Sequence, residues 1–348
     1  MATRADGQLP GPPRVTLRDV ALRAGVSPRT VSNVVNDFPY VAEPTRLRVR
    51  EALAELGYQP NMVARSLRKG RTGLIALVLP ELDVPYFSEL TRLVVDEARR
   101  HGFTVMIDQT NGDLAVERDL VRRNARGELF DGMIFSPLAL RAEDLTAGPA
   151  AGYPVVLLGE HADAGPYDHI VIDNVRAARI ATEHLITIGR RRIAAIGDQP
   201  YPGGETAQYR TEGYRRALLA AGLPFDERLV APAGSFHRGD GATATRRLLR
   251  GPHRPDAVFC YNDLLAFGAM RAILERGLRV PHDIAVVGFD DTEEGRYTTP
   301  TLTTISPAKK QIAEIAVRTL LRRIEGYTTP PRTVTARHRL RVRESTAP

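Results

Sequence analysis

Four polar residues, Arg29, Ser32, Asn33 and Asn36, lie close together in the stretch 27–36. The valines of the same stretch recur at a helical spacing and would bury one side of a helix, which leaves these polar side chains on its other faces. An arginine can grip guanine and an asparagine can grip adenine through paired hydrogen bonds in the major groove of DNA. The chemistry that these residue types favour is therefore the reading of base edges.

Two short helices joined by a tight turn would position these side chains. Thr16 can cap the first helix, with Asp19 three residues later, where the acid of a capping box belongs. Gly25 is suited to the left-handed conformation that often ends a helix. Ser27 can cap the second helix, and Pro28 stands at its first position, where proline costs nothing. A plain helical hairpin inside a larger domain has the same pattern, so both interpretations stand on these residues alone.

A third helix is predicted over about 44–56, with Arg46, Arg48 and Arg50 on its outer side, where they could meet phosphates. Three helices in so few residues form a bundle that can only just support itself. Charge is concentrated in the same region: residues 1–70 hold 11 Lys/Arg and 6 Asp/Glu, whereas the other 278 hold 37 and 35. This asymmetry within a net charge of +7 is typical of a protein with a polyanionic partner.

Length and composition indicate a soluble globular protein of two or three domains. The apolar run 74–79 ends at Pro80 and is too short to span a bilayer. Residues 1–13 are rich in Gly and Pro without an apolar signal-peptide core, so we expect a disordered lead-in and a cytoplasmic protein. The single cysteine, Cys260, excludes an intramolecular disulfide and any multi-cysteine metal site. Its apolar neighbours predict a buried, inert thiol.

The segment 58–70, YQPNMVARSLRKG, connects this region to the rest of the chain. Asn61 is a plausible cap, but a helix this short is marginal in water without a partner surface. Leu67 beside Arg65 and Arg68 fits an apolar wedge in the minor groove, flanked by phosphate contacts. An ordinary amphipathic connector is the alternative.

The motifs T-L-x-D-V-A, A-G-V-S-x-x-T-V-S, V-V-N, T-R, L-G-Y-x-P-N and A-R-S-L occur in this order between residues 15 and 69. On these motifs the stretch resembles the DNA-binding head and hinge of the lactose-repressor (LacI/GalR) family of bacterial transcription regulators. The resemblance implies that Pro28, Arg29 and Asn33 read bases and that Leu67 enters the central step of a two-fold operator. The DNA-binding residues that we expect are Thr16, Ser27, Pro28, Arg29, Thr30, Ser32, Asn33, Asn36, Asn61, Ala64, Arg65, Leu67 and Arg68.

From residue 73 onward, continuous apolar runs alternate with helical stretches. Strands are expected at 73–79, 103–107, 131–136, 154–159, 169–173, 191–197, 256–261 and 283–290, and helices at 87–101, 115–126, 176–188, 208–221, 240–250, 262–276 and 308–325. Continuous apolar strands between helices indicate buried parallel sheets of the doubly wound class. So many strands predict two such sheets, with a ligand in the cleft beyond their carboxyl ends.

Polar and aromatic residues follow these strands, and their types suit a small polyol. Arg and Asp can bind paired hydroxyls, and aromatic faces can cover the C–H side of a sugar ring. The effector-binding residues that we expect are Tyr86, Phe87, Asp173, Arg210, Phe236, Asn262 and Asp290. Each has a plainer alternative: Asp290 and Asn262 can be helix caps, and Phe87 can be core packing. Their shared place at strand ends favours a site.

The resemblance extends over the core, through P-Y-F-S-E-L, H-I-V-I-D-N, E-H-L-I-x-x-G-R-R-R-I, P-D-A-V-F-C-Y-N-D, V-P-x-D-I-A-V-V-G-F-D-D and L-T-T-I. It implies a two-lobed core like the periplasmic sugar-binding proteins, whose cleft is lined at the positions of Phe87, Arg210, Phe236, Asn262 and Asp290. The fold class expected is an all-α helix-turn-helix head (14–60), a hinge (61–70) and an α/β core (71–348). The first lobe is expected at about 71–173 and 304–327, and the second at about 174–303 and 328–343.

These expectations combine into a sequence-specific DNA-binding regulator, most simply a repressor, whose effector is a sugar or sugar derivative. The C-terminal end has no leucine heptads, which predicts a homodimer rather than a tetramer. No cofactor or metal is expected, because the histidines are scattered and no nucleotide-binding or nucleophile motif occurs apart from a loose glycine match at 239–244. A solute-binding protein and a sugar-modifying enzyme are the alternatives; the basic head argues against the first and the lack of a catalytic set against the second.

Overall fold

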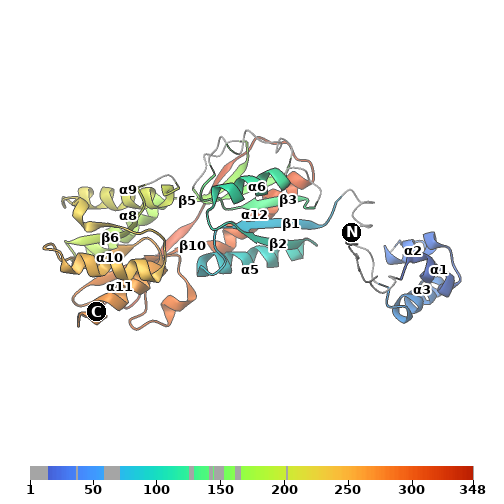
Figure 1. Ribbon diagram of the computed structural model, residues 1–348, viewed down its shortest axis with the longest axis horizontal. Helices are drawn as coiled ribbons and strands as arrows, with labels where there is room; N and C mark the ends of the chain where they lie inside the picture. Colours follow the sequence, from blue (N-terminus) through green and yellow to red (C-terminus); the bar gives the residue numbers. More distant parts are fainter. Residues whose placement is uncertain are drawn as a thin grey trace, which may run out of the picture. The chain divides into compact units, whose positions relative to one another are not determined.

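The computed structural model describes residues 15–36, 38–58, 71–124, 129–140, 144, 153–160, 166–200 and 203–347. The chain forms two compact units, Met1–Thr72 and Gly73–Pro348, which we call the head and the core (Figure 1). The predicted lead-in, 1–13, and hinge, 61–70, lie outside the described residues.

The head is a bundle of three helices, α1 (Leu17–Ala24), α2 (Pro28–Val35) and α3 (Glu43–Glu55). Thr16 and Asp19 form a capping box at the start of α1, in which the Thr16 amide donates to the Asp19 carboxylate at 2.8 Å. This bonding lowers the pKa of Asp19. Gly25 ends α1 in the left-handed region with φ of 65°. The small core of the bundle consists of Val20, Ala21, Ala24, Val31, Val34, Val49 and Ala52.

The first lobe of the core contains a six-stranded sheet in the order β11-β5-β4-β3-β1-β2, with every pair parallel. Its strands are β1 (Leu74–Leu79), β2 (Thr104–Gln109), β3 (Gly132–Phe135), β4 (Val155–Leu158), β5 (Asp168–Ile172) and β11 (Thr333–Ala336). Alternate residues of β1 point to opposite faces. Ile75 and Leu77 pack against α5 (Pro85–Arg100) and α12 (Lys309–Ile324), whereas Ala76 and Val78 pack on the side of α6 (Leu114–Asn124).

The second lobe contains a sheet in the order β12-β10-β9-β8-β6-β7, which is parallel except for the antiparallel pair of β12 and β10. Its strands are β6 (Ile193–Asp198), β7 (Val230–Pro232), β8 (Ala257–Cys260), β9 (Ala285–Phe289), β10 (Thr303–Pro307) and β12 (His338–Arg341). One face is covered by α8 (Asn174–Thr187) and α9 (Glu205–Ala220), the other by α10 (Arg238–Arg250) and α11 (Asp263–Glu275) (Figure 1). Short 3₁₀ helices, η1 (Glu227–Leu229) and η2 (Glu293–Arg296), lie in the connections.

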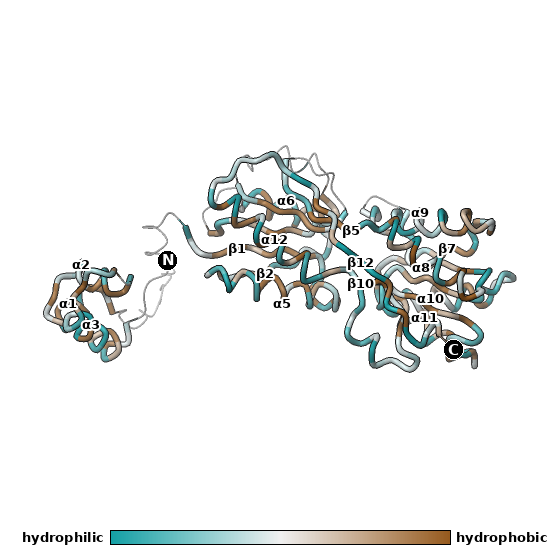
Figure 2. The backbone as a smooth tube through the Cα atoms, turned by 180° about the vertical axis from the view of Figure 1, so that it is seen from behind, coloured by the Kyte–Doolittle hydropathy of each residue, from teal (hydrophilic) through white to brown (hydrophobic). Residues whose placement is uncertain are grey.

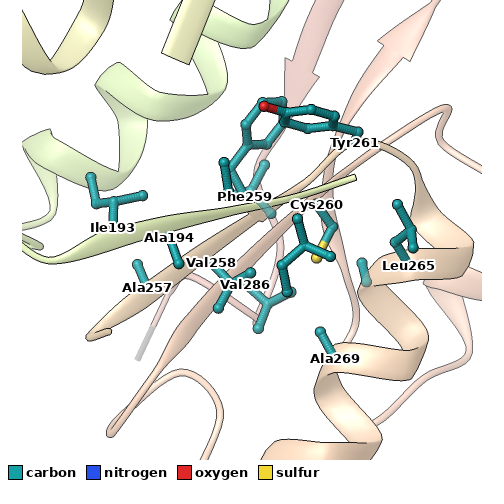
Figure 3. Packing of buried hydrophobic residues seen from close by; sticks show 14 of the residues in the cluster. Ile193, Ala194, Ala257, Val258, Phe259, Cys260, Tyr261, Leu265, Ala269 and Val286 are labelled. Atoms are coloured by element: carbon teal, nitrogen blue, oxygen red, sulfur yellow. The ribbon is translucent and has the colours of Figure 1, made fainter. Parts of the chain in front are cut away.

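Hydrophobic segments coincide with the central strands and with the inner sides of the helices (Figure 2). In β8, Phe259 points to one face of the sheet and Val258 and Cys260 to the other, toward α11 (Figure 3). Cys260 is fully buried, which confirms the predicted burial of this thiol. Burial raises the pKa of the thiol well above the ordinary value, which disfavours the reactive thiolate.

Two short strands lie in other lobes than we predicted. β10 belongs entirely to the second sheet, so the chain crosses to the first lobe after Pro307 rather than after residue 303. β11 belongs to the first sheet, so the return crossing lies between Ala336 and His338 and not at 328. These two strands are rich in Thr and carry no continuous apolar run, so their sheet membership is decided by tertiary pairing.

Candidate functional site

The predicted base-reading residues form one stripe along α2. Arg29, Ser32, Asn33 and Asn36 are spaced i, i+3, i+4 and i+7, on the side of the helix away from the buried Val31 and Val34. Arg29 is exposed, whereas Ser32 and Asn33 are half-buried. Asn36 already donates its side-chain amide to the carbonyl O of Ser32 at 2.7 Å, so it ends the helix as well as flanking the stripe.

The hydroxyl groups of Ser27 and Thr30, beside this stripe, form hydrogen bonds at the N-terminal end of α2. The Ser27 Oγ accepts from the Thr30 amide at 3.1 Å and lies 2.9 Å from the Thr30 hydroxyl. Pro28 occupies the first turn, exposed and without a donor. Arg46 is not the outward-pointing cation that we expected. Its side chain is 12% exposed and donates to the Phe38 carbonyl O at 2.9 Å.

The remaining predicted DNA contacts, Asn61, Ala64, Arg65, Leu67 and Arg68, lie outside the described residues. Their roles stay predictions. The described part of the predicted interface is therefore the stripe on α2 together with the caps of α1 and α2.

The core encloses a cavity of about 900 Å³ between its two lobes, lined by residues that follow strands of both sheets. This volume is within the range of small-molecule sites. The lining includes six of the seven predicted effector residues: Tyr86, Phe87, Arg210, Phe236, Asn262 and Asp290. The rings of Tyr86 and Phe87 meet edge to face, with centroids 5.2 Å apart, and Phe87 also packs against the core of the first lobe.

Asp173 is absent from the cavity lining, although we predicted it there. Its carboxylate caps α8 and accepts from the Arg176 amide at 2.9 Å. The residue after β5 also precedes a helix, and an aspartate at that position is well suited to satisfy the free amides of the first turn. The next residue, Asn174, makes the polar contact to the site instead.

Arg210 of α9 is the central cation of the cavity and is 6% exposed. Its Nε donates to the Asn174 side-chain oxygen at 2.8 Å, and its Nη1 donates to the carbonyl O of Tyr261. The guanidinium carbon lies 3.6 Å from the centre of the Phe289 ring, a cation–π arrangement. Backbone, amide and ring therefore fix this side chain in place before any ligand arrives.

Asp290 follows β9 and carries the carboxyl group that faces Arg210. Burial raises the pKa of this carboxyl from 3.8 to about 7, against the opposing pull of Arg210 and Lys309. The backbone of Asp290 has φ of 111°, a conformation that L-residues rarely adopt. Lys309 Nζ holds the turn by donating to the carbonyl O of Asp290 at 2.8 Å and of Asp291 at 3.1 Å. Such strain at a fixed position is typical of a functional site.

Asn262 has a double role. Its side-chain oxygen accepts from the Leu265 amide at 2.8 Å and caps α11, while its Nδ2 donates to the carbonyl O of Phe236 at 2.8 Å. The plainer interpretation as a helix cap is therefore correct, and the same residue still lines the cavity.

Glu160, a carboxylate in the lining two residues after the end of β4, is not among the predicted effector residues. It accepts from the Ile172 amide at 2.7 Å and from the Thr206 hydroxyl at 3.2 Å, and burial raises its pKa. Its position at a strand end is the signal that could have revealed it.

Glu117 was also missed, and it shapes the wall of the cavity without lining it. The fully buried carboxylate accepts from the amides of Leu138 at 2.9 Å, Ala139 at 2.9 Å and Leu140 at 2.8 Å. It thereby fixes the loop whose Leu138 and Ala139 line the cavity. No pattern marks a single glutamate inside an amphipathic helix for this role.

Polar contacts join the lobes around the cavity. Glu160 of the first lobe meets Thr206 of the second, and His237 Nε2 of the second lies 2.9 Å from the Glu81 carboxylate of the first. The cavity is therefore bordered by contacts between the two lobes as well as lined by residues of both.

The chemistry of this cavity is recognition by hydrogen bonds and ring faces. Within the described ranges, no group of three or more His, Cys, Asp or Glu side chains is placed to hold a metal ion. None of the described helices has the length and apolar character needed to cross a membrane.

Both the head and the core are similar to known protein families. Residues 16–61 match the family described as "Bacterial regulatory proteins, lacI family", and residues 182–346 match the "Periplasmic binding protein-like domain". The chain is 34% identical over 336 residues to the HTH-type transcriptional repressor PurR of Yersinia pestis (strain Pestoides F), covering 95% of this chain and 97% of that protein.

Two solved structures are similar over most of the chain. The lac repressor dimer bound to operator and the anti-inducer ONPF has a TM-score of 0.85 at 29% identity, over 96% of this chain and 99% of that one. The complex of the transcriptional regulator CelR with cellobiose has a TM-score of 0.72 at 34% identity, over 95% and 100%.

These likenesses confirm the predicted fold class, a helix-turn-helix head with a periplasmic-binding-protein-like core, and the predicted family. The relatives are transcriptional repressors and regulators, so the protein is a DNA-binding regulator under small-molecule control and not an enzyme. The chain belongs to the lacI family of bacterial regulatory proteins.

Proposed function

We propose that the protein is a homodimeric repressor that binds a pseudo-palindromic operator and responds to a sugar or sugar derivative in the core cavity. The observation that carries the proposal is the pairing of an arginine–asparagine stripe on α2 with a cavity in the core that is lined by charged and aromatic side chains. The lac repressor dimer on its operator and the CelR–cellobiose complex support both halves.

The DNA contacts divide into two groups. Arg29 and Asn33 are assigned to base edges, and Ser27, Thr30 and the caps of α1 and α2 to phosphates. The hinge residues Asn61, Ala64, Arg65, Leu67 and Arg68 are assigned to the minor groove, where Leu67 would unstack the central step and bend the duplex.

Arg29→Ala is expected to weaken specific operator binding by about 1–3 kcal/mol and to leave binding to random DNA nearly unchanged, because a base contact carries sequence information. Selection of bound duplexes from a random library first defines the operator. Fluorescence anisotropy at fixed salt then compares operator with scrambled duplex.

Arg48→Ala on α3 is the control, because this exposed arginine lies away from the stripe and can contribute only a phosphate contact. It should lower both affinities by a similar factor. An equal loss on both duplexes for Arg29→Ala would remove its base-reading role.

The ligand class follows from the lining. Arg210, Asp290 and Glu160 offer a donor and two acceptors for adjacent hydroxyls, and Tyr86, Phe87 and Phe236 offer ring faces. A thermal-shift screen of sugars and nucleosides is the most direct test, because a ligand that binds only the folded state raises its melting temperature. A response confined to nucleosides would overturn the sugar assignment.

Dimerisation is supported by β2, an edge strand of the first sheet. Its outer edge is unpaired among the described strands, and its Met106 and Ile107 are 49% and 44% exposed. An exposed apolar edge strand is normally covered, here by a second copy of the chain.

Met106→Asp is expected to shift the protein toward monomer, because it places a charge on the proposed interface. Light scattering at micromolar concentration measures this. Leu219→Asp is the control, since Leu219 is 51% exposed but lies on α9 of the other lobe. A wild-type monomer, or an unchanged dimer in Met106→Asp, would contradict this assignment.

A regulator that binds chromosomal DNA works in the cytoplasm, and we propose that this protein is associated with the nucleoid. The placement rests on its membership of the lacI family.

A further inference from the structure

A second cavity, of about 290 Å³, lies in the first lobe between α12 and the segment that leads into β11. Its lining shares only Ile170 with the lining of the effector cavity. Four arginines line it: Arg318, Arg322, Arg323 and Arg332.

One of these arginines is part of the frame. Arg323 Nε donates to Asp168 at 2.7 Å, and its Nη1 donates to the carbonyl O of Tyr327 at 3.1 Å and of Thr329 at 2.6 Å. The second oxygen of Asp168 accepts from the Arg332 amide at 3.0 Å, and Asp168 is 5% exposed. Asp168, the one carboxylate among the described residues of the lining, is therefore committed to holding the loop in shape.

The guanidinium groups of the other three arginines form no ion pair with a carboxylate of the described residues. Arg318 Nε donates to the carbonyl O of Glu314 at 3.2 Å. Within the part of the chain that the structure describes, no carboxylate lies within 4.0 Å of Arg318, Arg322 or Arg332. The dipole of α12 favours a cation in its last turn, which accounts for Arg322, but Arg332 belongs to another segment. Several like charges around one hollow leave it strongly positive.

We propose that this cavity binds the phosphoryl group of a small molecule, either inorganic phosphate or a phosphate monoester. Guanidinium forks match phosphate oxygens in paired hydrogen bonds, and Tyr327 in the lining adds a hydroxyl donor. The volume lies at the lower limit of the range of roughly 300–1,000 Å³ typical of small-molecule sites, which fits phosphate or a sugar phosphate better than a nucleotide.

Calorimetric titration of the full chain at fixed salt tests this with inorganic phosphate, glucose 6-phosphate and glucose. We expect saturable binding of one or both phosphorylated probes, and at least about tenfold weaker binding for Arg322→Gln and for Arg332→Gln. Arg122→Gln on α6 removes an equally exposed positive charge from the same lobe and should bind as wild type does. Tighter binding of the sugar phosphate identifies a metabolite site, and equal binding identifies a phosphate site.

The outcome for Asp290→Asn separates this site from the effector cavity. The variant should keep its affinity for the phosphorylated probes, because Asp290 does not line the second cavity. No saturable binding to wild type, an equal loss in Arg122→Gln, or loss of binding in Asp290→Asn would overturn the proposal.

Discussion

Effector binding by this protein is expected to strengthen as the pH rises through about 7, and Asp290→Asn is expected to remove that dependence. The Asp290 carboxyl has its pKa raised to about 7 by burial in the unliganded cavity. Ligand hydroxyls donate to the ionised form, so below pH 7 the carboxyl must first lose its proton and affinity falls about tenfold per unit. The asparagine keeps the shape but has no proton to lose, so its affinity should be low, and the step near pH 7 should be absent; any pH dependence that is left then belongs to Glu160, whose pKa is also raised by burial.

Calorimetry between pH 5.5 and 8.5, in buffers of different ionisation enthalpy, measures both the affinity and the protons released. Wild type should release close to one proton per ligand well below pH 7 and none at pH 8.5. Asp198→Asn is a matched control, because Asp198 ends β6 outside the cavity lining and bonds the Thr211 hydroxyl at 2.8 Å. A pH-independent wild type, or an Asp290→Asn variant with the wild-type slope, would show that Asp290 does not meet the ligand as a carboxylate.

The same raised pKa affects the unliganded fold in the opposite sense. A carboxyl whose pKa is higher in the folded protein than in the unfolded chain stabilises the fold most at low pH. The contribution of Asp290 is therefore present below about pH 4 and lost as the pH rises toward 7. Above about pH 7, where this contribution to the free energy of unfolding is lost, a ligand that binds the ionised Asp290 carboxylate stabilises the folded protein.

The strand-end rule located most of this site from sequence because it rests on topology rather than on local propensity. Parallel strands bring their carboxyl ends to one edge, so Arg210, Asn262 and Asp290 converge although they are far apart in the chain. The rule failed at Asp173 because a strand end that is also a helix start has two uses for an acid, and the cap is the nearer partner. It would have found Glu160 if every strand end had been inspected.

The role of Glu117 and the pairing of the short strands depend on residues that are distant in the sequence, so neither can be predicted from local patterns. Glu117 is recognisable as a loop anchor only through the three amides that it binds from 21 to 23 residues away. Four-residue strands such as β11 and β12 have too few apolar positions to be predicted as strands from the sequence. The predicted position of the lobe crossing between them was therefore wrong. The helical head was easier, because its caps and its apolar spacing are encoded within a few residues.

Arg210→Met is expected to destabilise the core by about 3–5 kcal/mol at pH 8 and to abolish effector binding. Removing the guanidinium leaves the buried carboxyls of Asp290 and Glu160 without the cation that faces both. It also leaves the Asn174 side-chain oxygen and the Tyr261 carbonyl without their donor.

Urea unfolding of the full chain, followed by a probe of the core transition, measures the loss. Arg216→Met on the same helix is the control, because Arg216 is exposed and its ion pair with Glu212 at 2.6 Å is a surface contact worth at most about 1 kcal/mol. The destabilisation by Arg210→Met should shrink between pH 8 and pH 6, since the carboxyls, whose pKa values rise further once the cation is gone, can then be neutral. A loss no larger than that of Arg216→Met, or one that grows toward acid pH, would mean that Arg210 does not neutralise these buried acids. If both expectations hold, Arg210 is the charge that allows two carboxyls to stay in a buried cavity and remain available to a ligand.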